Sequence, residues 1–156
     1  MNDTTKSRTV CFTGHREVLH NDIGKKLDET VTALAEKGYL YFGTGGAKGF
    51  DYLAAKSILR VQKKFPDIKL IIVVPCENYY SSWPKSERDS YLELMNEAHK
   101  VKVMSDHYYR GCMQVRNRHL VDNSSVCVCY KYKNDGGTAF TVEYARKQGL
   151  TVLNVI

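Results

Sequence analysis

Two glycine-rich segments have the residue types and spacing best suited to a chemical role in this sequence. Residues 43–49 read Gly-Thr-Gly-Gly-Ala-Lys-Gly, with Phe50 and Asp51 next, and residues 135–138 read Asp-Gly-Gly-Thr. Glycine lets the backbone approach a ligand closely, and free amides at the start of a helix attract anions. Two such segments in one short chain predict a phosphate-bearing ligand, although glycines also occur at such turns for geometric reasons alone.

The spacing within residues 43–49 fits neither of two common phosphate-binding motifs. No Gly-Lys-Ser/Thr ends the segment as in a P-loop, and Gly49 falls one place late for G-x-G-x-x-G. Asp51 has two interpretations: it caps the helix that follows, or its carboxylate accepts hydrogen bonds from ligand hydroxyls, as acidic residues do with ribose. Thr138 is expected to cap the helix after the second segment.

Charged side chains follow two other expected strands. His15 and Arg16 come directly after Gly14 at the end of the first strand, where they either meet an anion or remain solvated. Arg116 and Asn117 lie in the first turns of an expected helix. An arginine can hold a phosphate bidentately, but Arg116 taken alone reads as a surface residue.

Aromatic residues follow the third expected strand. Tyr79, Tyr80 and Trp83 lie in a loop where they either stack on a base or pack the loop onto the domain. Together these segments predict one ligand site at the strand ends. The predicted ligand-binding residues are Gly14, His15, Arg16, Gly45, Gly46, Ala47, Lys48, Gly49, Asp51, Arg116, Asn117, Gly136, Gly137 and Thr138.

The elements that must position these residues alternate along the chain. Strands are expected at residues 9–13, 39–42, 69–74, 101–104, 125–130 and 151–155. Helices are expected at residues 22–37, 50–65, 85–99, 113–122 and 138–148. This order predicts an α/β fold: a Rossmann-like open, mainly parallel sheet with helices on both faces. In such sheets ligands bind beyond the carboxyl ends of the strands, where the segments above fall.

Length and composition predict one globular domain. The 156 residues are 43% hydrophobic and 26% charged, so residues 9–156 are expected to form a single domain after a flexible N-terminus at residues 1–8. The net charge of +6 favours anionic partners, but the basic residues are dispersed, so nucleic acid is not the favoured partner. A homo-oligomer is compatible with this composition.

The cysteines indicate a reducing compartment. Their number is five, and no pair has C-x-x-C spacing. No signal peptide is visible and the apolar run at residues 70–75 is too short to span a membrane, so we expect a cytoplasmic protein. The histidines are scattered, and no metal site is expected. No cofactor is predicted beyond a nucleotide-type ligand.

Taken together and in their order along the chain, the motifs resemble those of the YpsA-like branch of the SLOG superfamily. The matching segments are residues 12–16, 45–51, 113–118 and 135–138, together with Glu143, and the resemblance extends over residues 9–156. It implies a Rossmann-like fold whose ligand site is built from the two glycine-rich turns. It also implies a nucleotide or nucleotide-derived ligand, which the protein would bind as a sensor.

Two related families supply alternative functions. The LOG phosphoribohydrolases cleave the N-glycosidic bond of nucleoside monophosphates, and their Arg-Lys helix and P-G-G-x-G-T-x-x-E signature resemble Arg116 and residues 135–143. That resemblance implies that Arg116 holds phosphate and that Glu143 stabilises positive charge on the ribose carbon. Asp135, Ala139 and Phe140 depart from the glycine signature, and Asn117 replaces the lysine of the Arg-Lys helix. The second relative, DprA, binds single-stranded DNA, which gives the other alternative.

Overall fold

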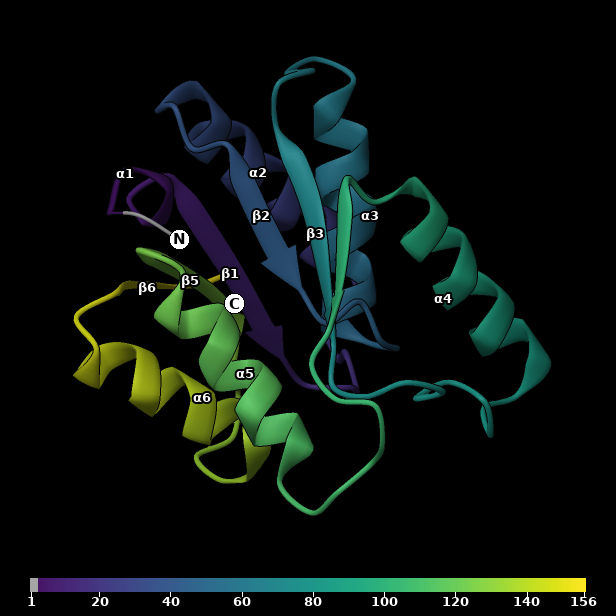
Figure 1. Cartoon of the computed structure of the whole chain (residues 1–156). Helices are drawn as coiled ribbons and strands as arrows, with labels where there is room; N and C mark the ends of the chain where they lie inside the picture. Colours follow the sequence, from purple (N-terminus) through teal and green to yellow (C-terminus); the bar gives the residue numbers. More distant parts are fainter. Residues whose placement is uncertain (1–2) are drawn as a thin grey trace.

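A six-stranded sheet runs through the centre of the protein, with the order β4-β3-β2-β1-β5-β6 and every neighbouring pair parallel (Figure 1). This computed structural model describes residues 3–156. The strands are β1 (Thr9–Gly14), β2 (Tyr41–Thr44), β3 (Lys69–Val74), β4 (Lys100–Val103), β5 (Val126–Tyr130) and β6 (Thr151–Asn154). The helices are α1 (Asp3–Lys6), α2 (Ile23–Glu36), α3 (Phe50–Gln62), α4 (Lys85–Glu97), α5 (Cys112–Asp122) and α6 (Gly136–Lys147). The predicted α/β, Rossmann-like fold is confirmed.

Helices cover both faces of this sheet (Figure 1). Parallel strands joined through helices form right-handed crossovers, so the steps from β1 to β4 place α2, α3 and α4 on one face. The chain then returns across the sheet to β5, which places α5 and α6 on the other face. The direction of strand addition reverses between β1 and β5, and this switch point is where such folds bind their ligands.

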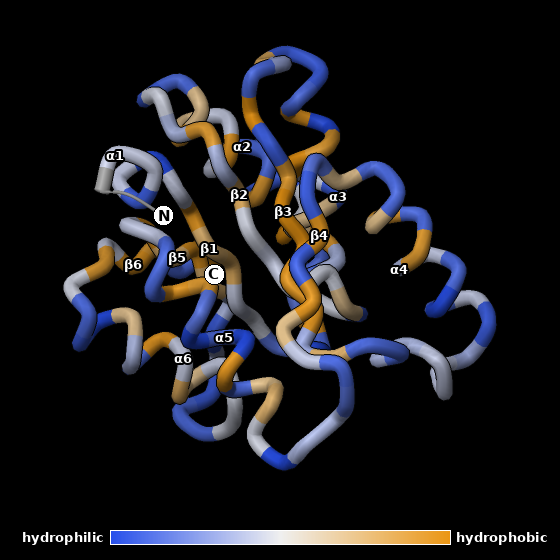
Figure 2. The backbone as a smooth tube through the Cα atoms, viewed as in Figure 1, coloured by the Kyte–Doolittle hydropathy of each residue, from blue (hydrophilic) through white to orange (hydrophobic). Residues whose placement is uncertain are grey.

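Apolar side chains pack against each face of the sheet. Side chains alternate along a strand, so Val10 and Phe12 join the core under α2 and α3, whereas Cys11 joins the core under α5 and α6. Figure 2 shows the hydrophobic stretches gathered along the strands and the hydrophilic ones on the loops and outer helix surfaces. Because helices cover both faces of the sheet, the strands are held in place and position the loops at their carboxyl ends.

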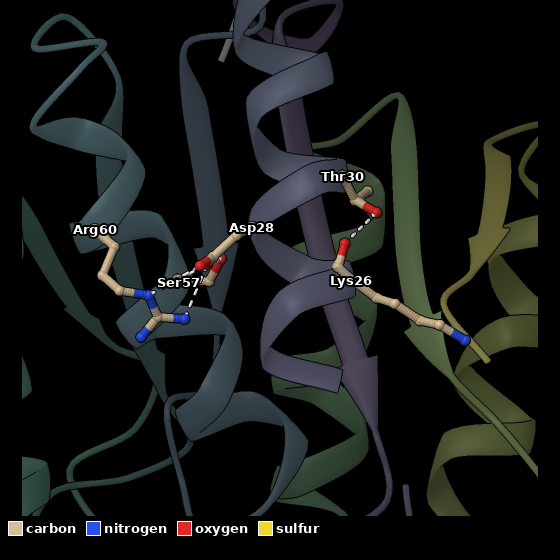
Figure 3. Close-up of polar contacts among 5 residues, drawn as sticks. All are labelled: Lys26, Asp28, Thr30, Ser57 and Arg60. Carbon is tan, nitrogen blue, oxygen red and sulfur yellow. Dashed lines mark hydrogen bonds and ion pairs between the residues drawn. The ribbon is translucent and has the colours of Figure 1, made fainter. Parts of the chain in front are cut away.

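A polar clamp ties α2 to α3 (Figure 3). The buried hydroxyl of Ser57 donates a 2.5 Å hydrogen bond to Asp28 Oδ1, and the Arg60 guanidinium donates to both carboxylate oxygens at 2.9 and 3.2 Å. Partial burial acts to raise the pKa of the Asp28 carboxyl, but the hydrogen bonds from Arg60 and Ser57 outweigh this effect, so the pKa is lowered. The clamp adds directional polar contacts to the apolar packing between α2 and α3.

The structure corrects two predicted boundaries that concern the site. Strand β2 was expected at residues 39–42 but spans Tyr41–Thr44, because Tyr41 pairs with Thr9 and Gly43 lies inside the sheet. Helix α6 begins at Gly136, so Thr138 lies within the helix and Asp135 occupies the N-cap position without a side-chain capping bond. The capping role expected of Thr138 is therefore wrong.

The described chain begins with a short helix. Of the flexible N-terminus predicted at residues 1–8, residues 1–2 lie outside the described part, and residues 3–6 form the short helix α1. The flexibility stays a prediction. Within residues 3–156, no helix has both the length and the apolar character needed to cross a bilayer.

Candidate functional site

A basic pocket of about 440 Å³ lies at the switch point between the loops that follow β1 and β5. We use the name basic pocket for the cavity lined by His15, Arg16, Glu17, Lys48, Tyr132 and Lys133. Arg16, Lys48 and Lys133 carry positive charge there, against the single carboxylate of Glu17. The arrangement suits an anionic group larger than a simple ion.

His15 joins the two loops that form this pocket. Its backbone amide donates to Tyr130 O at 3.4 Å, and its Nε2 atom accepts a 3.2 Å hydrogen bond from the backbone amide of Tyr132. Burial, followed by the charge of Lys133, lowers the pKa of His15, which keeps the ring neutral with its proton on Nδ1. His15 therefore acts here as a structural acceptor and adds no permanent charge to the pocket.

The loop at residues 45–49, which we call the glycine loop, packs directly against the loop after β1. The backbone amide of Phe50 donates to His15 O at 3.2 Å. Gly49 has a φ of 99°, and a Cβ atom at this position would overlap the backbone of Arg16. A Cβ atom at Gly14 would likewise overlap the Phe50 ring. Only glycine at these positions lets the two loops meet this closely.

The glycine loop leaves backbone donors free at the start of α3. The Gly46 amide donates to Thr44 Oγ1 at 3.3 Å. Within residues 3–156, the amides of Ala47, Lys48 and Gly49 donate no hydrogen bond, and the N-cap residue Gly49 has no side chain to satisfy the helix start. Free amides and the positive end of the helix dipole favour an anion here.

Two buried ionisable side chains, those of Asp51 and Arg116, lie beneath the glycine loop. A Cβ atom on Gly45 would overlap the Arg116 guanidinium and would lie 3.1 Å from Asp51 Oδ2, so both groups touch the same glycine. Arg116 is only 4% exposed. It donates to Val73 O at 3.0 Å and to Asn117 Oδ1 at 2.8 Å. The surface interpretation of Arg116 is wrong, because the arginine supports the loop from below.

Asp51 is the least satisfied polar group of the site. Its Oδ1 atom is buried and has no hydrogen-bond partner among residues 3–156. Burial raises the pKa of the carboxyl from 3.8 to about 6, against the opposing charge of Arg116. Asp51 follows the first residue of α3 and makes no capping bond, so the capping interpretation is wrong. An orphaned buried acceptor at a strand end marks a candidate functional residue.

The aromatic loop after β3 packs onto α4. Tyr79, Tyr80 and Trp83 all place their rings against Tyr91, with centroid separations of 5.0 to 6.2 Å. The Tyr91 hydroxyl donates to Gly45 O at 3.1 Å, which links this cluster to the glycine loop. The packing interpretation of the loop is therefore confirmed, and Trp83 nevertheless remains partly exposed.

A second cavity, of about 220 Å³, lies between the glycine loop and α4. We call it the aromatic pocket, and its lining residues are Gly46, Lys48, Gly49, Tyr52, Trp83, Ser86, Glu87, Ser90 and Tyr91. Lys48 lines both pockets and pairs with Glu87 Oε1 at 3.0 Å. Because this ion pair is partly exposed, it holds Lys48 only weakly.

The second glycine-rich turn is more open than the first. Gly136 and Gly137 are exposed, and a Cβ atom on either would meet nothing within 4 Å. Neither glycine lines the basic pocket, whereas Tyr132 and Lys133, just before them, do. Glu143 is exposed on α6 and makes no described contact with Arg116. The ligand role of this turn and the catalytic role of Glu143 stay predictions.

The structure gathers most of the predicted site residues around one loop. The gathered residues are Gly14, His15, Arg16, Gly45, Gly46, Ala47, Lys48, Gly49, Asp51, Arg116 and Asn117. Sequence reasoning missed Tyr132 and Lys133, although they follow β5 directly and the strand-end rule would have found them. It also missed Tyr91, which lies inside α4 and reads as an ordinary core residue. Within residues 3–156, no group of three or more potential ligand residues could hold a metal ion.

Comparisons with known sequences connect this geometry to a family. The chain matches the YpsA model, described as the YspA SLOG family, over residues 6–152. A UPF0398 protein of Halalkalibacterium halodurans is 27% identical over 137 residues, which cover 86% of this chain and 71% of that protein. A UPF0398 protein of Bacillus thuringiensis is 25% identical over 155 residues, covering 91% of this chain and 84% of that protein.

Solved structures with the same fold include two DNA processing proteins. DprA of Streptococcus pneumoniae superposes with a TM-score of 0.71 at 20% identity, covering 96% of this chain and 50% of that one. DprA of Helicobacter pylori, described for its single-stranded DNA binding mode, superposes with a TM-score of 0.67 at 17% identity. That alignment covers 97% of this chain and 67% of the Helicobacter chain. The chain thus spans half the length of the pneumococcal protein, and the likeness is one of fold.

Proposed function

This chain belongs to the YspA SLOG family, and we propose that it binds a nucleotide or nucleotide-derived ligand at the switch point, as a sensor. The observation that carries the proposal is the basic pocket, whose positive side chains surround a cavity beside free helix-start amides. Arg16 and Lys133 flank the phosphate from the loops after β1 and β5, and Lys48 approaches from the glycine loop. The fold places such a cavity where α/β proteins bind ligands.

Asp51 supplies the recognition of a hydroxyl in this proposal. Its orphaned Oδ1 atom gains a hydrogen bond when a ribose hydroxyl donates to it. Such a bond offsets the cost of burying the carboxylate without a partner. The glycine loop must move slightly for the ligand to reach this oxygen. Arg116 supports the loop from below.

Calorimetry with inorganic pyrophosphate and adenosine diphosphate tests the proposal. Replacing Arg16 and Lys133 together by glutamine should weaken binding of both ligands by about a hundredfold or more, since each charged hydrogen bond contributes about 1.5–3 kcal/mol. The matched control replaces Lys25 and Lys147, which are exposed and line neither pocket, by glutamine. Equal affinities for both double variants and the unmodified protein would remove the basic pocket as the site.

Single-stranded DNA is the second candidate ligand. The likeness in fold to the Helicobacter DprA, described for its single-stranded DNA binding, favours it, as does the net charge of +6. We expect weak, salt-sensitive binding, because the cations do not form one dense block. Fluorescence anisotropy with a labelled oligonucleotide at two salt concentrations measures this affinity. Tight binding at physiological salt would make single-stranded DNA the favoured ligand.

Nucleotide N-glycosidase activity, with Arg116 and Glu143 as its catalytic pair, is an alternative that a screen for release of free base would detect.

The five cysteines are all unpaired and buried, which accords with the cytoplasmic location that we propose.

A further inference from the structure

The aromatic pocket is separated from the basic pocket only by Lys48 and Gly49. Lys48 lines both cavities. Gly49 lines the aromatic pocket and packs against the backbone of Arg16, which lines the basic pocket. A ligand with its phosphates in the basic pocket therefore needs to pass over Lys48 and Gly49 to reach the aromatic pocket.

The size and lining of the aromatic pocket suit one ring system. Its volume of about 220 Å³ is below the roughly 300–1,000 Å³ of cavities that hold a whole small molecule. Trp83 and Tyr52 are partly exposed and supply aromatic surface, while the Tyr91 ring, which also borders the cavity, is buried. Aromatic side chains stack on planar rings, and nucleobases are the planar rings that accompany phosphates in biological ligands.

The polar groups of this pocket lie along one side of α4. Ser86, Glu87 and Ser90 line the cavity with Tyr91, and all four lie within two turns of the helix. Glu87 accepts from Lys48 through Oε1, and its other oxygen, Oε2, accepts no described hydrogen bond. A carboxylate can only accept hydrogen bonds, so it favours a ring edge that carries N–H donors. Guanine presents two such donors side by side, adenine presents an amino group, and uracil a single ring N–H.

We propose that the aromatic pocket binds the nucleobase of the same ligand, with guanine preferred, so that the ligand is a nucleoside diphosphate or a larger molecule containing one. This inference rests on the proposed function for the position of the phosphates. The base stacks against Trp83, Glu87 accepts from its N–H edge, and the serine hydroxyls complete the contacts.

Trp83 provides a direct readout, because it is the single tryptophan of the chain. Guanosine, adenosine and uridine diphosphates and inorganic pyrophosphate are titrated in turn, with calorimetry and tryptophan fluorescence recorded together. We expect guanosine diphosphate to bind about tenfold or more tightly than pyrophosphate and to change the Trp83 emission, while pyrophosphate leaves the emission unchanged. Adenosine and uridine diphosphates should follow in that order.

Two variants address the pocket and one serves as control. Glu87→Gln replaces the acceptor oxygen by a donor and should reduce the guanosine preference at least about tenfold, with pyrophosphate affinity kept. Ser90→Leu fills the cavity and should bring every nucleotide to the affinity of pyrophosphate. Glu93→Gln makes the same chemical change on an exposed position of α4 that lines neither pocket, and should alter nothing.

The outcomes separate this inference from the proposal beneath it. If all nucleotides bind like pyrophosphate with no change at Trp83, the base site is overturned while the phosphate site stands. If guanosine diphosphate changes the Trp83 emission in a manner sensitive to Glu87→Gln but pyrophosphate does not bind, the base site stands and the phosphate site fails. If none of these ligands binds, both proposals fail.

Discussion

The two glycine-rich turns look alike in sequence but differ in what surrounds them. Around the first, added Cβ atoms on Gly45 and Gly49 would overlap a buried arginine and a neighbouring backbone. Around the second, added Cβ atoms on Gly136 and Gly137 would meet open space. Glycine at the first turn is thus required by close packing at a site, whereas at Gly136 a φ of 88° is the requirement. A glycine motif reveals its role only through its neighbours.

The largest effect should come from placing a side chain at the tightest glycine. Gly49→Ala combines a left-handed φ with an overlap against backbone, so we expect a loss of about 3–5 kcal/mol in the free energy of unfolding. Denaturant unfolding followed by circular dichroism measures it. Gly137→Ala is the matched change at the second turn, where the loss should be absent. Equal losses at both turns would break the comparison.

The next effect concerns the buried carboxylate under the first turn. Because the pKa of Asp51 rises from 3.8 in the unfolded chain to about 6 in the fold, the fold holds a proton that the unfolded chain has lost. Stability should therefore fall by about 2–3 kcal/mol as pH rises from 4 to 7. Asp51→Asn should remove this slope and stabilise the protein at pH 7.5, while weakening nucleotide binding.

Asp135→Asn is the control for that experiment, since Asp135 is exposed at the second turn. It should leave the pH dependence of the free energy of unfolding as it is in the unmodified protein. A slope that survives in Asp51→Asn would show that another group causes it. Unfolding curves at four pH values between 4 and 7.5 suffice to distinguish these results.

A smaller effect should come from the histidine that connects the two loops. His15→Phe removes the acceptor for the Tyr132 amide, at a cost of about 1 kcal/mol. The pKa of His15 lies below its ordinary value, so its contribution is present above pH 6.5 and is lost as pH falls through the lowered pKa. Subtracting the unfolding free energy of the variant from that of the unmodified protein at each pH isolates this contribution.

The smallest effects are expected at the second turn and the helix behind it. Gly137→Ala should raise the free energy of unfolding by about 0.5–1 kcal/mol, because Gly137 lies inside α6 and alanine favours a helix. Glu143→Gln should change nucleotide affinity less than about twofold, because Glu143 is exposed and lines neither pocket. A larger loss of affinity would move the second turn into the ligand site.

Local patterns in the sequence were enough to predict the fold. The unbroken apolar run of β3 and the glycines that end β1 and follow β2 are signals carried by neighbouring residues, and the expected strand at residues 69–74 matches β3. The start of β2 was placed two residues early because pairing with Thr9 fixes that strand, and pairing is not a local property. Arg116 was misjudged for the same reason: only the tertiary packing brings it under Gly45.

The clamp of Asp28, Ser57 and Arg60 has a consequence for how the protein responds to a ligand. Apolar helices can slide past each other in small steps at little cost, whereas this carboxylate is held by directional bonds at fixed positions. Ser57 lies about 9 Å along α3 from Asp51, so the start of α3 is anchored from within its own helix. Ligand binding should therefore reshape the loops at the start of α3 more than it shifts α3 along α2.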